Sequence, residues 1–313
     1  MYFLGVDGGG TKTQIILADE NENVIGVSFT GPTYIRSVFG DTLKKTLEEG
    51  IFFAIQNSHL KDVKIARSCF GIAGLDSPSD FAEVLKIVKS ITSVRLDPHP
   101  LILNDAVCAL RRGTNKGYGI SIVAGTGSNC YARSKFGAET FVGGLGHTLS
   151  DEGGGYFVGL NVLHAASKSF DGRIEKTILE EMVYEEFGVL SMRDLLSKVY
   201  RDGFGKMEIA RLSILCEEAN EKGDAKAHEI LQSAAKELVL MVKTGAKKLD
   251  MILDEFDLVC VGGSFKREHG PIRKFFEKEI KENLKRANII YPVNEPAMGA
   301  VLIAIDRYKV LKR

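Results

Sequence analysis

Apolar and polar residues alternate over the opening segment of the chain, with breaks at glycines and polar turns. Alternation with a period of two is typical of strands that bury one face. The pattern therefore predicts a meander of three strands, over residues 2–6, 13–18 and 24–29. After the meander, apolar residues recur every four positions from Leu43 to Ile55, which predicts a helix with Asp41 as its cap.

Strands and helices then alternate, and the whole order occurs twice. The first half ends with a strand, a helix, a short strand and a helix, over residues 63–71, 81–91, 101–103 and 106–112. A second meander covers residues 119–124, 128–133 and 140–142. After a mostly helical segment, the last strands and helices cover residues 257–261, 271–284, 288–290 and 296–308. Each half thus reads βββαβαβα, which predicts two mixed sheets with helices on their faces.

The repeat defines an α/β protein of two domains, residues 1–115 and 116–313. The second domain contains the helical insert, at about 153–250, and the last helix is free to pack back on the first domain. No proline-rich or serine-rich linker separates the halves, so we expect them to share a cleft.

Composition and charge narrow the range of partners. The chain has 313 residues, of which 44% are hydrophobic, enough for a sizeable core. Its 41 basic and 41 acidic residues cancel, so it lacks the positive field of a nucleic-acid binder or of a protein that binds membrane surfaces. A small-molecule partner fits better.

Cysteine usage and apolar runs bear on location. The five cysteines are scattered and never form a C-x-x-C pair, which argues against a disulfide framework or a zinc site. No secretory signal opens the chain, and no apolar run approaches the length of a membrane span. We therefore expect a soluble, cytoplasmic protein.

Glycines cluster at corresponding turns of the two halves. Residues 7–13 (Asp-Gly-Gly-Gly-Thr-Lys-Thr) and 125–129 (Gly-Thr-Gly-Ser-Asn) each join the first two strands of a half. Bare backbone N–H groups in such turns can hold phosphate oxygens. A third loop, residues 262–264 (Gly-Gly-Ser), follows a strand, where a flat ring has room to lie against the backbone. One such turn alone is commonly just a hairpin, but the three together predict a nucleotide site.

Other nucleotide-binding patterns are missing. The single Gly-Lys pair is followed by Met207, so there is no G-x-x-x-x-G-K-[ST] loop, and no G-x-G-x-x-G follows a strand. Neither a P-loop nor a Rossmann fold is indicated.

The glycine loops and the duplicated order resemble the sugar kinase, heat-shock ATPase and actin superfamily. Three stretches are similar to N-acetylglucosamine kinase-like members of the BadF/BadG/BcrA/BcrD ATPase family: residues 5–13, 125–130 and 143–153. The resemblance covers nearly the whole chain in order and is weakest in the helical insert. It implies two actin-like (ribonuclease H-like) domains and a sugar kinase that uses ATP and Mg²⁺.

The resemblance also implies roles for single residues. Asp105 matches the base that accepts the proton of the sugar hydroxyl, and Asp7 matches the carboxylate that holds Mg²⁺ through water. The implied ATP contacts are Gly9, Gly10, Thr11, Lys12, Thr13, Gly125, Thr126, Gly262, Gly263 and Ser264. The implied sugar contacts are Thr33, Tyr34, Asn104, Gly127, Ser128, Asn129 and Asp151.

Simpler structural roles compete with these. Asp105 and Asp151 could each serve only at the start of a helix, where a carboxylate is favoured, and Asp7 could belong to an ordinary tight turn. Tyr34 departs from the family's loop, in which Asn is expected at its position, so acetamido specificity stays open.

The resulting hypothesis is ATP-dependent phosphorylation of a hexose hydroxyl, most simply the 6-hydroxyl of N-acetylglucosamine. Glucosamine, glucose and N-acetylmuramic acid stay open as substrates, and so does a homodimer. The alternatives from other classes are a BadF-type electron activator, which needs an iron–sulfur cluster held by cysteines, and a sugar sensor without turnover.

Overall fold

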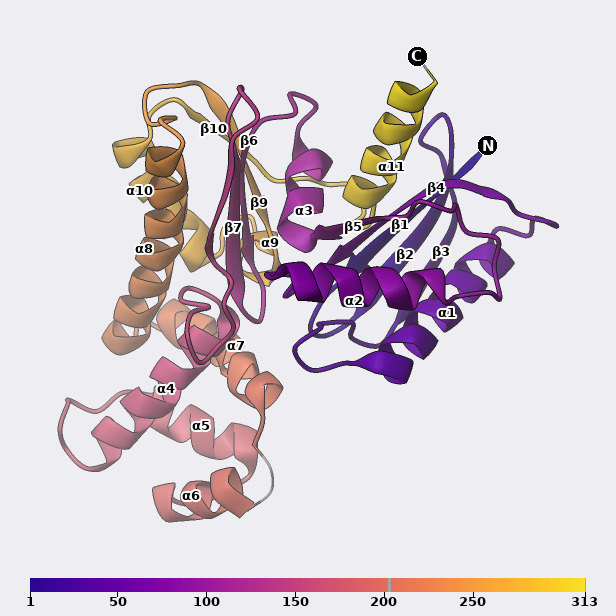
Figure 1. Cartoon of the computed structure of the whole chain (residues 1–313). Helices are drawn as coiled ribbons and strands as arrows, with labels where there is room; N and C mark the ends of the chain where they lie inside the picture. Colours follow the sequence, from indigo (N-terminus) through magenta and orange to yellow (C-terminus); the bar gives the residue numbers. More distant parts are fainter. Residues whose placement is uncertain (202–203, 313) are drawn as a thin grey trace. The chain divides into compact units, whose positions relative to one another are not determined.

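The computed structural model describes residues 1–201 and 204–312, and it contains two five-stranded sheets (Figure 1). The first has the order β3-β2-β1-β4-β5 and is formed by β1 (Tyr2–Gly8), β2 (Thr13–Asp19), β3 (Val24–Thr30), β4 (Ile65–Ile72) and β5 (Leu101–Asn104). The second has the order β10-β9-β6-β7-β8 and is formed by β6 (Gly119–Ala124), β7 (Ser128–Arg133), β8 (Glu139–Gly143), β9 (Phe256–Val261) and β10 (Ala287–Ile290). Read in the opposite direction, the second order is β8-β7-β6-β9-β10, so the strands of each half are arranged in the same way. This agreement confirms the predicted duplication.

Helices follow the strands in the same repeated order. The first half contributes α1 (Gly40–Asn57), α2 (Pro78–Lys89) and α3 (Asp105–Gly113). The second half contributes α9 (Gly263–Lys266), α10 (Pro271–Asn283) and α11 (Met298–Leu311). The insert forms α4 (Gly155–Phe170), α5 (Leu179–Phe187), α6 (Met192–Arg201), α7 (Lys206–Glu221) and α8 (Ala225–Lys248). Residues 202 and 203 of the predicted insert lie outside the described residues.

The chain forms two compact units, Met1–Ser121 with Ile290–Arg313, and Ile122–Ile289. The first unit therefore includes α11, which packs against β1, β4 and α3. The domain limits 1–115 and 116–313 remain our proposal for where the two halves of the repeat meet.

Two apolar layers cover the faces of the first sheet. Because neighbouring residues of a strand point to opposite faces, Leu4 and Val6 join one cluster and Phe3 joins the other. The first cluster includes Leu47 of α1, and the second includes Val301 of α11. The sheet is thus buried on both sides, which fixes the carboxyl ends of its strands.

One local prediction needs correction, and one short helix was not predicted. Helix α1 begins at Gly40 with Phe39 at the N-cap, so Asp41 lies in the first turn and does not cap the helix. Phe39 has extended backbone, and no side-chain hydrogen bond caps this helix. The short helix α9 was also not predicted, because four residues are too few for a periodic pattern.

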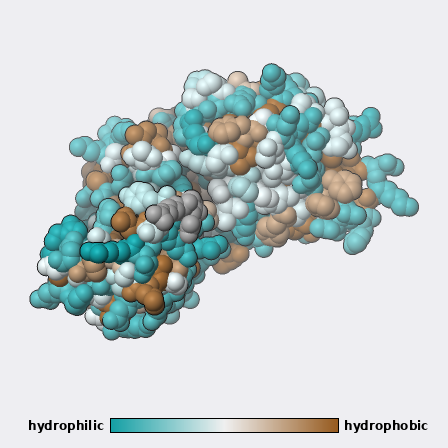
Figure 2. All heavy atoms as spheres, turned by 90° about the horizontal axis from the view of Figure 1, so that it is seen from below, coloured by the Kyte–Doolittle hydropathy of each residue, from teal (hydrophilic) through white to brown (hydrophobic). Residues whose placement is uncertain are grey.

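Hydrophilic residues and separate apolar patches share the face of the molecule seen in Figure 2. Within residues 1–201 and 204–312, no helix is both long enough and apolar enough to cross a membrane.

Candidate active site

Three parallel strands of the first unit bring two of the predicted carboxylates to one edge of the sheet. β1 pairs with β4 and β4 with β5, all in parallel. Asp7 is paired with Gly71 near the end of β1, and Asp105 directly follows the last residue of β5. The carboxyl ends of parallel strands lie at the same edge, where open α/β sheets commonly bind ligands.

The start of α3 separates the roles of Asn104 and Asp105. Asn104 is the N-cap, and its Oδ1 accepts the N–H of Ala106 at 3.0 Å. Its amide nitrogen donates to the carbonyl of Leu75 at 3.2 Å, so this buried side chain ties β5 to the segment after β4. Asp105 is the first helical residue, and its Oδ1 also accepts the N–H of Ala106. Capping is therefore not a role that depends on Asp105.

Burial makes both carboxylates weak acids. Burial raises the pKa of Asp105 to about 7, and the negative charges of Asp7 and Asp76 add to the shift. Burial also raises the pKa of Asp7 to about 6, against the opposing charges of Arg112 and Lys12. A carboxyl group of ordinary pKa would be a weaker proton acceptor than Asp105 at neutral pH.

The first glycine loop is a tight hairpin turn closed by a hydrogen bond from the N–H of Gly9 to the carbonyl of Lys12. Gly10, Thr11 and Lys12 are exposed, and the Lys12 ammonium lies 5.0 Å from the centre of the Phe29 ring. Exposed backbone and a cation at the turn are consistent with contact to a phosphate.

Thr13 differs from the rest of this loop because its hydroxyl is buried. It donates to the carbonyl of Gly31 at 2.8 Å and lies 2.9 Å from the hydroxyl of Thr33, which is also buried. The two threonines therefore pin the Thr33–Tyr34 loop to the glycine hairpin. A Cβ at Gly8 would lie 2.1 Å from the Thr33 hydroxyl, so this contact requires glycine.

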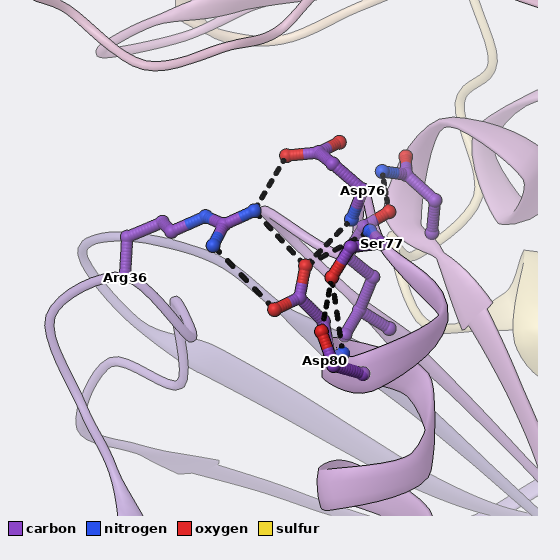
Figure 3. Close-up of polar contacts among 7 residues, drawn as sticks. Arg36, Asp76, Ser77 and Asp80 are labelled. Atoms are coloured by element: carbon purple, nitrogen blue, oxygen red, sulfur yellow. Dashed lines mark hydrogen bonds and ion pairs between the residues drawn. The ribbon is translucent and has the colours of Figure 1, made fainter.

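A cluster of charged residues holds the Tyr34 loop to the segment that follows β4 (Figure 3). Arg36 bonds both carboxylate oxygens of Asp80, at 2.9 and 3.4 Å, and one of Asp76, at 3.5 Å. Asp80 in turn accepts the N–H groups of Asp76 and Ser77 and completes a capping box at α2. The segment between β4 and α2 is thus held both by Arg36 of the Tyr34 loop and by Asp80 of α2.

Tyr34 packs against that segment. A Cβ at Gly74, whose φ is +80°, would lie 2.5 Å from the Tyr34 ring. Only glycine therefore allows the ring to approach the backbone this closely. The Tyr34 ring, which stands where Asn is expected, is thus packed into the structure of this loop.

The second glycine loop lies in the other unit and supports the first turn of α4. The N–H of Gly125 bonds the carbonyl of Gly127 and closes the turn. The carbonyls of Gly125 and Thr126 accept the N–H groups of Gly155 and Tyr156. Because no side chain caps α4, these loop carbonyls satisfy N–H groups that a helix start leaves open.

Asp151 lies against this loop and does not cap the helix. The N-cap of α4 is Gly154, and the carboxylate of Asp151 instead bonds the ammonium of Lys206 at 2.9 Å. A Cβ at Gly127 would lie 2.3 Å from Oδ2 of Asp151. The structure therefore places Asp151 next to Gly127 and excludes the simple capping role.

Ser128 and Asn129 join the same cluster from β7. The hydroxyl of Ser128 donates to the carbonyl of Glu152 at 2.6 Å, which ties the strand to the Asp151 segment. Asn129 packs against Gly144, where a Cβ would lie 2.6 Å from its amide oxygen. The glycine-rich stretch at 143–153 has positive φ at Gly143, Gly144, Gly146, Asp151 and Gly153. This left-handed backbone explains the glycines of the motif.

The third loop follows β9. Gly262 has a φ of +108°, and its Cα lies close to Ala124 of β6, since a Cβ would be 2.2 Å from the Ala124 carbonyl oxygen. Gly263 is exposed and begins α9, followed by the half-buried Ser264. Among the described residues, no heavy atom lies within 4 Å of a Cβ built at Gly263 or at Gly125.

These features fit ATP and Mg²⁺. Open space beside Gly125 and Gly263 leaves room for a ligand at both loops of the second unit. Asp7 and Asp105 are two carboxylates that burial disfavours in their charged form, and a divalent cation offsets such charge. Mg²⁺ suits one or two carboxylates, because it keeps several of its waters.

Sequence reasoning missed several charged residues of this region. Asp76 lies in the short segment between β4 and α2, and a carboxylate soon after a strand was a usable signal. Lys206 is separated from Asp151 by 55 positions, and its place beside a helix start carried no pattern. Arg112, which lies near enough to Asp7 to oppose the rise in its pKa, was equally hidden in a helix.

Comparison with known proteins finds relatives of similar sequence and a solved structure of similar fold. The chain is 35% identical to the N-acetylmuramic acid/N-acetylglucosamine kinase of Clostridium acetobutylicum, over 97% of this chain and 98% of the relative. It is 31% identical to the N-acetyl-D-glucosamine kinase of Dictyostelium discoideum, over 98% of each. The structure of a candidate N-acetylglucosamine kinase from Chromobacterium violaceum superposes with a TM-score of 0.76 at 19% identity, covering 97% of this chain and 98% of that one, which shows the shared fold.

The family model described as the BadF/BadG/BcrA/BcrD ATPase family matches residues 4–304. This range includes all three glycine loops and both sheets apart from the first two residues of β1. The chain therefore belongs to the BadF/BadG/BcrA/BcrD ATPase family.

Proposed function

We propose that this protein is a sugar kinase that transfers the γ-phosphoryl group of ATP to the 6-hydroxyl of an N-acetylated amino sugar. The observation that carries the proposal is the match, over nearly the whole chain, to two kinases of such sugars. N-Acetylglucosamine appears in the names of both relatives and N-acetylmuramic acid in one, so N-acetylglucosamine is the first substrate to test.

Asp105 is the proposed general base. Phosphoryl transfer demands mainly placement of the acceptor oxygen and neutralisation of phosphate charge. A carboxylate with a pKa near 7 is well matched to accept the hydroxyl proton at neutral pH. Its position at the strand end, outside the capping role, leaves this carboxylate available for the sugar.

The other groups divide between phosphates and sugar. Backbone N–H groups of the two hairpin turns, with Lys12, are suited to phosphate oxygens, and the open loop at Gly263 is suited to the base of the nucleotide. Asp7 would hold Mg²⁺ through water, and the cation would supply charge neutralisation on the phosphates. Asp151 and Asn129 are the proposed ligands of the sugar hydroxyls.

Three residues with an implied ligand contact have a supporting role in this proposal, because their side chains bond other parts of the protein. Thr13 and Thr33 use their hydroxyls on each other, and Asn104 uses its amide on Ala106 and Leu75. We propose that their part in binding is to hold the loops that carry Gly9, Gly10 and Tyr34.

The electron-activator alternative is not favoured. Such a protein needs cysteines that can reach a cluster, whereas Cys69, Cys108, Cys130, Cys216 and Cys260 are all buried. We propose a cytoplasmic location, where ATP is available and these thiols stay reduced.

A sugar panel tests the proposal. Purified protein with ATP and Mg²⁺ is given N-acetylglucosamine, N-acetylmuramic acid, glucosamine or glucose, and sugar-dependent ADP release is measured. Phosphorus and proton NMR of the product then locate the phosphate. We expect turnover with an N-acetylated sugar and a 6-phosphate product. ADP release that no sugar stimulates would overturn the proposal.

A further inference from the structure

Lys206 and Asp151 form an ion pair at the second glycine loop. Their side chains are 24% and 8% exposed, and the Lys206 ammonium lies 2.9 Å from Oδ2 of Asp151. The same oxygen is the one closest to Gly127. The ammonium is therefore placed next to the carboxylate that the proposed function assigns to the sugar, although 55 positions separate the two residues in sequence.

The start of α7 determines where Lys206 lies. Gly205 is the N-cap, and its N–H donates to the Glu208 carboxylate at 3.0 Å, which ties the N-cap to the first turn of the helix. The next residue, Met207, contacts the hydroxyl of Thr126 through its sulfur at 3.9 Å. Consecutive residues of α7 thus touch both the Gly125–Gly127 loop and Asp151.

Asp151 combines an uncommon backbone conformation with a nearly buried side chain. Its φ is +70°, a left-handed conformation that few non-glycine residues adopt, and it is nearly buried. Backbone strain of this kind tends to persist where function requires a particular side-chain position. A nearly buried carboxylate also needs a partner for its charge, because burial of an unpaired charge is costly.

One partner does not saturate the carboxylate. An ionised Asp offers about four lone-pair positions, and the Lys206 bond uses one of them. An ionised carboxylate can only accept hydrogen bonds, so a sugar hydroxyl that binds Asp151 must be the donor. A sugar hydroxyl that donates to an ionised carboxylate makes a stronger bond than one that donates to a neutral group.

We propose that Lys206 is a positioning residue of the kinase: its ammonium pairs with the Asp151 carboxylate and fixes its direction, so that the carboxylate is preorganised to accept hydrogen bonds from sugar hydroxyls. This inference rests on the proposed function, since it assigns a sugar to Asp151. It links the helical insert, where sequence resemblance is weakest, to recognition of the acceptor.

Two other roles would give different results. If the pair only stabilised the fold, its loss would lower the melting temperature without a separate effect on sugar binding. If Lys206 instead bound phosphate, its loss would weaken nucleotide binding. Only positioning predicts a loss that is confined to the sugar and that depends on Asp151.

The test compares Lys206→Met and Lys206→Arg in the full-length protein. Titration calorimetry gives Kd for N-acetylglucosamine and, separately, for Mg²⁺ with a non-hydrolysable ATP analogue, and thermal unfolding gives Tm. Lys226→Met is the matched control, since it removes an ammonium from the exposed Lys226–Glu229 pair of the same unit. Asp151→Asn, alone and with Lys206→Met, completes a double-mutant cycle.

We expect Lys206→Met to raise the sugar Kd by about tenfold or more, the loss typical of a disturbed charged hydrogen bond. Its nucleotide Kd should stay within about twofold of wild type, inside the usual additivity error. Lys206→Arg should recover most sugar affinity, and Lys226→Met should match wild type. In the Asp151→Asn background, Lys206→Met should add little.

Three results would overturn the inference. These are an unchanged sugar Kd in Lys206→Met, an equal loss of nucleotide affinity, and fully additive losses in the cycle. If Lys206→Met fails to fold, Lys206→Gln carries the test, because it also removes the charge and must raise the sugar Kd more than the nucleotide Kd. Wild-type protein that phosphorylates no hexose would refute the proposed function itself, whereas active wild type with an indifferent Lys206→Met refutes only the inference.

Discussion

Asn104 holds the N-cap of α3, and Asp105 follows it as the first residue of the helix. The amide of Asn104 reaches both the helix start and the segment after β4. Replacing Asp105 therefore leaves the cap in place. Variants of Asp105 consequently report on its chemistry and its charge.

The first prediction concerns stability. Burial, with added repulsion from Asp7, raises the pKa of Asp105 from 3.8 to about 7. The folded state therefore binds a proton more tightly than the unfolded state, so the stability contributed by this group is full below pH 3.8 and is lost as pH rises to about 7. Asp105→Asn avoids this loss, and we expect its Tm at pH 8 to exceed that of wild type by about 2 °C or more.

Thermal unfolding of both proteins across pH checks this sign. The gap between them should narrow as pH falls towards 4, where the wild-type carboxyl is protonated in the folded state. A gap that widens on acidification would mean that Asp105 is stabilised in its charged form.

The second prediction concerns the pH dependence of catalysis. A base must be deprotonated to act, so kcat/KM for the sugar should fall below pH 7, approaching about tenfold per pH unit. Mg²⁺ and ATP bring positive charge and phosphates to the site, so kcat can follow a different profile in the complex. Initial rates measured from pH 5.5 to 8.5 test this dependence. A kcat/KM that does not change with pH would contradict the assignment of Asp105 as the base.

The duplicated fold was accessible from sequence because its signals are local. Alternation in the strands, glycines at the turns and the repeat of both in the second half predicted the order of the elements along the chain and two mixed sheets. The places of Asp105 and Asp7 near strand ends were accessible for the same reason, since Asp105 directly follows β5 and Asp7 is the last residue but one of β1. Their roles came from the family resemblance and stay predictions.

Contacts between distant segments were not accessible. The partner of Asp151 is 55 positions away at the start of a helix, and no periodicity marks it. The family resemblance implied ligand contacts for Thr13 and Thr33. Only the folded loop shows that both residues are buried and that their hydroxyls bond each other. Burial also set the pKa of Asp105, which composition cannot indicate.

The third prediction uses Gly127. In Gly127→Ala the new Cβ would lie 2.3 Å from the Asp151 carboxylate, so this carboxylate must move. We expect the sugar KM to rise by about tenfold or more, as for loss of a charged hydrogen bond. The matched variant Gly125→Ala meets no described atom within 4 Å, and it should affect the nucleotide KM more than the sugar KM. Steady-state kinetics with each substrate varied gives both KM values. A larger effect of Gly127→Ala on the nucleotide KM than on the sugar KM would contradict the prediction.

The fourth prediction concerns specificity. Tyr34 stands where the family's loop is expected to have Asn, and its ring packs on Gly74. Tyr34→Asn introduces an amide that can pair with an acetamido group, and sites with matched hydrogen bonds discriminate strongly. We expect the ratio of kcat/KM for N-acetylglucosamine to that for glucose to rise about tenfold or more. An unchanged ratio, with Tyr34→Phe as the control, would place Tyr34 outside the sugar site.

The central claim is that Asp105 accepts the proton of the sugar hydroxyl, and kcat of Asp105→Asn at saturating ATP, Mg²⁺ and sugar tests it most directly. Asn preserves the shape and, with Asn104 still at the N-cap, the start of the helix. General-base catalysis typically contributes about 100-fold to 10,000-fold. The account predicts that sugar binding persists by calorimetry while kcat falls within that range. A loss of kcat smaller than about tenfold, below the general-base range, would contradict it.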